Sequence, residues 1–118
     1  MSISRTTNCR SSMSLSPHHA SVQQPHTKRW SEKIDSLDAY IFVTPEYNHV
    51  TSAALKNAID FPYHEWNNKA AGFVGSGGAG GVRAVENLRL VMGEIKIADV
   101  RAQVALSLYA DFRELHDL

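Results

Sequence analysis

The sequence has one cysteine, no excess of either charge and no long apolar run. Cys9 cannot form a disulfide within the chain and has no CxxC partner, so a reducing compartment and a cytoplasmic location are expected. No apolar run approaches the roughly 20 residues that cross a bilayer, and the N-terminus lacks the apolar segment of a secretory signal. The sequence therefore predicts no membrane partner.

The charge balance disfavours a nucleic-acid partner. Lys plus Arg and Asp plus Glu both number 12, whereas nucleic-acid binders usually carry a basic excess. The histidines also predict no metal site, because His49 and His64 have no partner at the helical spacing of two zinc ligands.

Residues 1–25 differ in composition from the rest of the chain. They are rich in Ser, Thr, Gln, His and Pro and contain no acid. A disordered tail is the first interpretation. An organelle transit peptide, or a tract that replaces a folded segment, are alternatives that stay open. A folded domain is expected over residues 26–118.

Apolar patterns predict three helices and three strands. The run Ala39–Val43 is rich in β-branched and aromatic residues, which is typical of a parallel strand buried on both faces. The other predicted strands are 70–75 and a segment within 100–108. Helices are predicted at about 27–36, capped by Thr27, at about 52–61, capped by Thr51 or Ser52, and at about 82–94. Alternating helices and strands predict an α/β fold with a parallel sheet.

The turn Pro45-Glu46-Tyr47-Asn48 follows the first predicted strand. In open α/β sheets ligands bind at the carboxyl ends of the strands. Tyr47 offers an aromatic face, Asn48 donates and accepts hydrogen bonds, and free N–H groups at the turn could serve a planar ligand. An ordinary strand-to-helix turn explains the same residues equally well.

A glycine loop, Gly75-Ser-Gly-Gly-Ala-Gly-Gly81, follows the second predicted strand. It matches GxGxxG, the dinucleotide fingerprint, but Asp99 falls before the next predicted strand rather than at its end, where the supporting acid belongs. A loop that lets a flat ligand approach the backbone is the favoured interpretation. A pyrophosphate site and a plain flexible turn are the alternatives.

These motifs resemble those of the NADPH-dependent FMN reductase family, which has a flavodoxin-like fold. The resemblance rests on Val43-Thr-Pro-Glu-Tyr-Asn48, Ala54-Leu-Lys-Asn-Ala-Ile-Asp60 and the glycine loop with Arg83 beyond it, and covers roughly residues 26–112. It implies an incomplete flavodoxin-like three-layer parallel sheet of about three strands. It also implies cofactor contacts at the turn and the glycine loop, namely at Pro45, Glu46, Tyr47, Asn48, Ser76 and Gly77.

The resemblance further implies a flavin-dependent oxidoreductase that passes a hydride from NADPH to FMN and on to a small acceptor such as a quinone. Because the cofactor performs the chemistry, no protein acid or base is expected. The helix Ser52–Phe61 and the loop Tyr63–Trp66 resemble the part that makes dimer contacts in the family, so a homo-oligomer, dimer or tetramer, is expected.

The chain departs from the family pattern at its beginning. The family opens with a strand and a Gly-Ser-x-Arg-x-x-Ser type loop that holds the FMN phosphate, and no segment here matches them. Weak FMN binding is therefore expected, and the strand at 39–44 should become a sheet edge. The alternative function is a catalytically impaired paralogue that acts as an oligomerisation or binding module.

Overall fold

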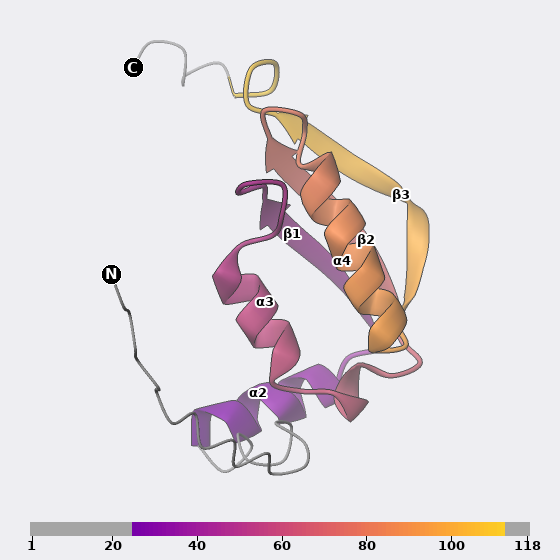
Figure 1. Cartoon of the computed structure of the whole chain (residues 1–118). Helices are drawn as coiled ribbons and strands as arrows, with labels where there is room; N and C mark the ends of the chain where they lie inside the picture. Colours follow the sequence, from indigo (N-terminus) through magenta and orange to yellow (C-terminus); the bar gives the residue numbers. More distant parts are fainter. Residues whose placement is uncertain (1–24, 113–118) are drawn as a thin grey trace, which may run out of the picture.

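A computed structural model describes residues 25–112, and residues 1–24 and 113–118 lie outside the description. The predicted N-terminal tail is therefore outside the described residues except for Pro25. The elements, in chain order, are α2 (Pro25–Asp35), β1 (Ala39–Pro45), α3 (Ala53–Asp60), the 3-10 helix η1 (His64–Trp66), β2 (Ala70–Gly77), α4 (Val82–Glu94) and β3 (Ala98–Ser107) (Figure 1).

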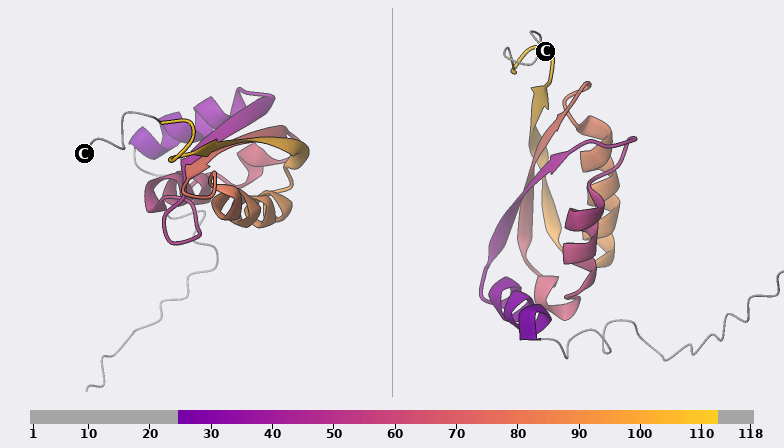
Figure 2. Two further views of the ribbon diagram at one scale, coloured as in Figure 1. Left: turned by 90° about the horizontal axis from the view of Figure 1, so that it is seen from above. Right: turned by 90° about the vertical axis from the view of Figure 1, so that its left-hand side faces the viewer.

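The three strands form one sheet in the order β1-β2-β3, and both neighbouring pairs are parallel. Helices α3 and α4 lie side by side on one face of this sheet, and α2 lies across its base (Figure 2). The arrangement confirms the predicted α/β class. It also brings the carboxyl ends of all three strands to one edge, opposite α2.

Two of the three helix starts agree with the sequence. Ser52 caps α3 by accepting a hydrogen bond from the N–H of Leu55 at 3.2 Å, and α4 has the predicted bounds. The predicted Thr27 cap is wrong. Thr27 lies inside α2 and is buried, and the first residue of the described helix is Pro25, which has no N–H to leave unpaired.

The core lies between the sheet and α3 and α4, with aromatic residues gathered at its base. Trp66 of η1 is 1% exposed, and its indole N–H donates to the carbonyl of Ile59 at 3.0 Å. The Tyr40 ring packs edge-on against Trp66, with centroids 4.9 Å apart. The segment Tyr63–Trp66, which was predicted from the sequence to be a loop, therefore contains a short helix whose tryptophan is a central core residue.

The prediction that the first strand is buried on both faces is wrong for the described chain. Phe42 and Thr44 point to the helix side and are buried, whereas Ile41 and Val43 are 74% and 68% exposed. Side chains alternate between the two faces of a strand, and the described helices on the sheet cover only one of them. As predicted, β1 lies at the edge of the sheet that residues 25–112 form.

The strands are longer than the sequence predicts. β1 includes Pro45 and β2 runs on through Ser76 and Gly77, because the ladder between them continues to the pair Pro45 and Ser76. β3 begins at Ala98, so Asp99 is inside the strand rather than before it. Ser76 and Gly77 are thus strand residues, and only Gly78–Gly81 form the connecting loop.

Candidate functional site

The two turns singled out by the sequence are neighbours at the carboxyl edge of the sheet. The N–H of Glu46 donates to the carbonyl of Ser76 at 2.8 Å, which joins the end of β1 to the end of β2. A Cβ placed on Gly77 would lie 3.0 Å from the Cβ of Glu46. The structure therefore brings Pro45–Asn48 together with Ser76 and Gly77, all six residues of the predicted site.

The turn after β1 is tight and projects past the sheet (Figure 1). Tyr47 and Val50 exchange two backbone hydrogen bonds, of 2.9 and 3.0 Å, and the two residues between them, Asn48 and His49, have positive φ angles of 50° and 72°. The backbone N–H groups of Asn48 and His49 have no acceptor among the described residues. Tyr47 is 60% exposed, so the turn presents free donors beside an open aromatic face.

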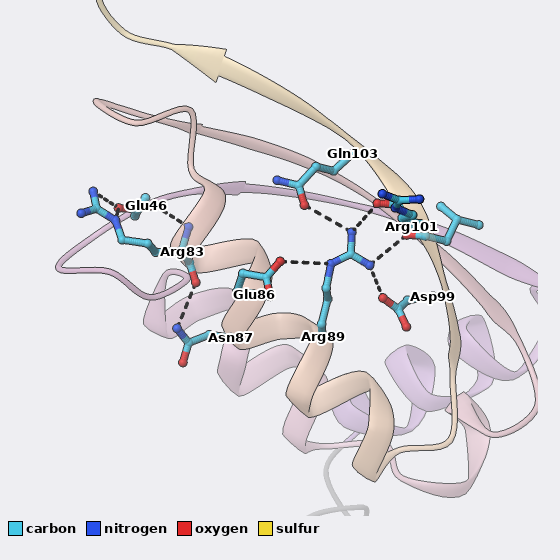
Figure 3. A network of polar contacts seen from close by, with 9 residues as sticks. Glu46, Arg83, Glu86, Asn87, Arg89, Asp99, Arg101 and Gln103 are labelled. Carbon is cyan, nitrogen blue, oxygen red and sulfur yellow. Dashed lines mark hydrogen bonds and ion pairs between the residues drawn. The ribbon is translucent and has the colours of Figure 1, made fainter.

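Glu46 points away from this open side, toward the start of α4. Its carboxylate accepts from Nε of Arg83 at 2.6 Å and from the backbone N–H groups of Arg83 and Ala84 at 3.1 and 3.4 Å (Figure 3). The Glu46 side chain is only 5% exposed. Burial raises the pKa of this carboxyl, but hydrogen bonds from the Arg83 side chain and the two backbone N–H groups outweigh burial, and its pKa lies below the ordinary value.

The contact of Glu46 with α4 bears on whether the glycine loop could bind a pyrophosphate. The N-terminus of a helix is where a pyrophosphate would bind in a dinucleotide fold. At α4 that position is taken by the Glu46 carboxylate, which would repel a second anion. Asp99, the nearest acid for the ribose, instead pairs with Arg89. The geometry thus disfavours the pyrophosphate interpretation of the GxGxxG match.

The glycines of the loop are required by the fold itself. Gly80 and Gly81 have positive φ angles of 70° and 68°, a conformation that side chains strongly disfavour. A Cβ on Gly81 would lie 2.5 Å from the backbone nitrogen of Ser76, and one on Gly75 would lie 2.9 Å from the carbonyl oxygens of Gly80 and Gly81. These positions are glycine because the loop folds back onto the end of β2.

Three residues near the site were not predicted from the sequence as site residues. The Arg83 guanidinium lies 2.8 Å from Nε2 of His49, and the Asn87 side-chain amide donates to the His49 carbonyl at 3.1 Å. These contacts tie the far end of the β1 turn to α4. Asn87 follows Arg83 by four residues, so the pair lies on one helix face, but its meeting with His49 depends on tertiary structure.

A third turn, at the end of β3, borders the same edge. The N–H of Leu108 donates to the carbonyl of Gly77 at 3.1 Å. The Tyr109 ring lies 3.4 Å from the position that a Cβ on Gly78 would occupy. This contact was not predicted from the sequence, because it depends on the parallel pairing of β2 with β3.

The residues fit the ring of a flavin better than they fit its phosphate. Unpaired N–H groups at Asn48 and His49 suit carbonyl acceptors, and the open face of Tyr47 suits a flat ring. The N-terminus of α4 offers no phosphate site because Glu46 occupies it. Within residues 25–112, no group of three His, Cys, Asp or Glu side chains could hold a metal ion. Over the same residues, no helix combines the length and apolar character that crossing a membrane requires.

The fold and the edge site define an α/β protein of flavodoxin-like architecture. A sequence model of the NADPH-dependent FMN reductase family matches residues 8–111. The chain belongs to the NADPH-dependent FMN reductase family. The match begins before residue 26, where the sequence resemblance was placed, so it includes part of the N-terminal tract.

The chain is similar to reductases of several organisms. It is 44% identical over 88 residues to an NAD(P)H-dependent FMN reductase of Schizosaccharomyces pombe, a match that covers 75% of this chain and 44% of the relative. It is 39% identical over 71 residues to an NAD(P)H:quinone oxidoreductase of Solanum tuberosum, covering 57% and 37%. The flavoenzyme FerB, an NAD(P)H:acceptor oxidoreductase of Paracoccus denitrificans, superposes with a TM-score of 0.69 at 25% identity, covering 81% of this chain and 59% of FerB.

Each match covers a larger share of this chain than of the relative. The chain spans about half or less of the length of these curated relatives. The family and the fold are therefore shown, whereas the activity of the relatives extends to this chain only as a proposal.

Proposed function

We propose that this chain is a flavin-dependent oxidoreductase that takes a hydride from NAD(P)H onto FMN and passes electrons to a small acceptor such as a quinone. The observation that supports it most is the hydrogen bond between Glu46 and Ser76, which joins the two turns that the family resemblance assigns to the flavin. Similarity to NAD(P)H-dependent FMN reductases and to quinone oxidoreductases supports the chemistry and the class of acceptor.

The roles of the site residues follow from their positions. FMN, when bound, supplies the hydride and electron chemistry. Asn48 and His49 would donate their unpaired N–H groups to the carbonyl edge of the ring, and Tyr47 would cover one of its faces. Glu46 acts indirectly. Arg83 and the start of α4 bind its carboxylate, and this contact fixes the position of the β1 turn relative to α4. No described side chain is assigned as acid or base.

Other parts of the proposal rest on the sequence. A cytoplasmic location, a homo-oligomeric state and the absence of a nucleic-acid partner remain proposals. Weak FMN binding is expected because the described residues provide the edge for the ring and no built anion site for the phosphate at α4. A submicromolar dissociation constant would contradict this part.

The test compares Tyr47→Ala with Leu90→Ala by calorimetric titration of FMN and by NADPH oxidation in the presence of FMN and a quinone. Tyr47 and Leu90 are 60% and 78% exposed, so neither truncation should unfold the chain. Loss of the ring should weaken FMN binding about two- to tenfold, since an aromatic contact contributes about 0.5–1.5 kcal/mol. Leu90→Ala, on α4 away from the turns, should leave it unchanged.

The alternative function is a binding or oligomerisation module without turnover. It is favoured if the folded wild-type chain shows no saturable NADPH oxidation at any FMN concentration while it still self-associates. Equal FMN affinity in Tyr47→Ala and the wild type would instead contradict the proposal that FMN binds at the β1 turn.

A further inference from the structure

The outer side of β1 has unpaired backbone groups. The carbonyl of Asp38 accepts from Ala70, and the N–H of Glu46 donates to Ser76, so even-numbered residues of this strand direct their backbone groups toward β2. In a parallel ladder the residues in between direct theirs the other way. Ala39, Ile41 and Val43 therefore present three N–H and three C=O groups that no other described strand meets.

This edge lacks the usual protection against pairing with another strand. Natural edge strands carry lysines, inward-pointing charges or bulges. The segment Ala39–Pro45 contains no charged residue, and the register shift of the sheet lies in the pairing of β2 with β3 instead. Only Pro45, which has no N–H, ends the run of donors.

A groove follows the same edge. Its volume is about 420 Å³, and its lining includes the edge residues Ile41 and Val43 between Trp30 of α2 and Leu55 and Ala58 of α3. Lys33 is the one charged residue among those that line it. An apolar groove beside a row of unpaired backbone groups suits an extended, uncharged strand.

We propose that the occupant is β1 of a second copy of this chain, paired antiparallel across a two-fold axis. Such an interface is self-complementary: with the axis near Ile41, Ala39 of one copy faces Val43 of the other, and each free donor meets a free acceptor. The uncharged β1 is itself the kind of strand that the groove suits. The formal net charge of zero sets no long-range repulsion against self-association.

The uncovered face of the sheet continues the same surface. Val43, Val74 and Val104 are register partners across the three strands, so their side chains lie in one row on the face opposite α3 and α4. Val43 and Val104 are 68% and 52% exposed. Pairing through β1 would join the uncovered faces of both copies in one six-stranded sheet. This surface differs from α3 and the Tyr63–Trp66 loop, which the family resemblance suggests for dimer contacts.

The test measures the association of the full chain by sedimentation velocity over a concentration series. The wild type should show reversible dimerisation. Ile41→Lys should weaken it at least about tenfold, because Ile41 lies at the axis and the substitution places two like charges directly opposite each other. Leu90→Lys is the matched control, since it places the same charge on a 78% exposed aliphatic position of α4, and it should dimerise like the wild type.

Amide hydrogen exchange on the wild type tests the pairing without any substitution. The N–H groups of Ile41 and Val43 should exchange more slowly as the concentration rises. A chain that stays monomeric, a dimer that survives Ile41→Lys, or one that is lost in Leu90→Lys would each overturn the proposal. Protection of these two amides already in the monomer would assign the edge to another segment of the chain and would also overturn it.

Discussion

Glu46 and Arg83 contact each other through both side chain and backbone. The Glu46 carboxylate binds the guanidinium, with 2.5 Å between Oε1 and Nη2, and it also accepts the N–H of Arg83 itself (Figure 3). One carboxylate thus caps α4 and neutralises the cation that follows the cap. Since Glu46 also holds Ser76 through its N–H, it connects β1, β2 and α4 at the edge that carries the candidate site.

Glu46→Gln should destabilise the chain by about 1 kcal/mol, the typical contribution of a helix cap. The effect should depend on pH with a defined sign. The folded pKa of Glu46 lies below its ordinary value, so the stabilisation is present above the unfolded pKa of about 4.3 and is lost as the pH falls through the folded pKa. Urea unfolding followed by circular dichroism should show the variant losing less stability than the wild type on acidification. An identical pH dependence in both would show that the contact does not form.

Arg89→Lys should cost about 1–3 kcal/mol although it keeps the charge. The guanidinium lies between α4 and the irregular part of β3, where Nη1 and Nη2 donate to the carbonyls of Val100 and Arg101 at 2.9 and 3.1 Å and Nη2 also reaches Gln103 (Figure 3). A lysine cannot reproduce this fork, and each hydrogen bond that it fails to replace costs about 0.5–1.5 kcal/mol. Urea unfolding measures the loss. Glu86→Gln is the control: its side chain is 66% exposed and 3.6 Å from Arg89, so the change should be within about 0.5 kcal/mol.

Two glycine-to-alanine substitutions should change stability in opposite directions. Gly81→Ala should cost at least about 2 kcal/mol, because φ is 68° and the new methyl would lie 2.5 Å from the nitrogen of Ser76. Gly93→Ala should stabilise by about 0.5–1 kcal/mol, since Gly93 lies inside α4 with nothing within 4 Å of its Cβ position. Thermal unfolding of both variants is the measurement. A stable Gly81→Ala chain would mean that the loop folds differently.

Trp66→Ala should destabilise the chain by about 3–5 kcal/mol, a large part of the total stability of a small domain. The side chain is fully buried, and its removal leaves a cavity and an unpaired carbonyl at Ile59. Trp30→Phe is the comparison, because Trp30 is 38% exposed and would lose mainly its 2.8 Å hydrogen bond to Ala58, at about 1 kcal/mol. Equal losses in the two variants would contradict the assignment of Trp66 to the core.

Local signals in the sequence predicted most of the fold. The apolar spacing of α4 gave its bounds, and Ser52 before an apolar period predicted the start of α3. The alternation of helices and strands was enough for the parallel order of the sheet. The wrong predictions concern environment: the composition of Ala39–Val43 suits a strand covered on both faces, and the described residues leave Ile41 and Val43 open.

The sequence predicted that the candidate site consists of two turns, but it could not predict the side-chain contacts between them and α4. The carboxyl ends of neighbouring parallel strands must meet, so the approach of Glu46 to Ser76 follows from topology. The inward turn of the Glu46 carboxylate could not be foreseen, because it depends on where α4 begins relative to β1. The contacts of His49 with Arg83 and Asn87 link residues that are 34 and 38 positions apart, a separation at which no local pattern operates.

The placement of the aromatic residues has a spectroscopic consequence. Both tryptophans of the chain lie at the base of the sheet, with ring centroids 6.5 Å apart, while the β1 and β2 turns lie at the opposite end. The wavelength of their emission maximum will therefore report on the packing of α2 against η1 and α3. The emission maximum can stay at a short wavelength while the β1 and β2 turns at the opposite end change. Tryptophan fluorescence therefore reports on the base of the sheet and not on the candidate site.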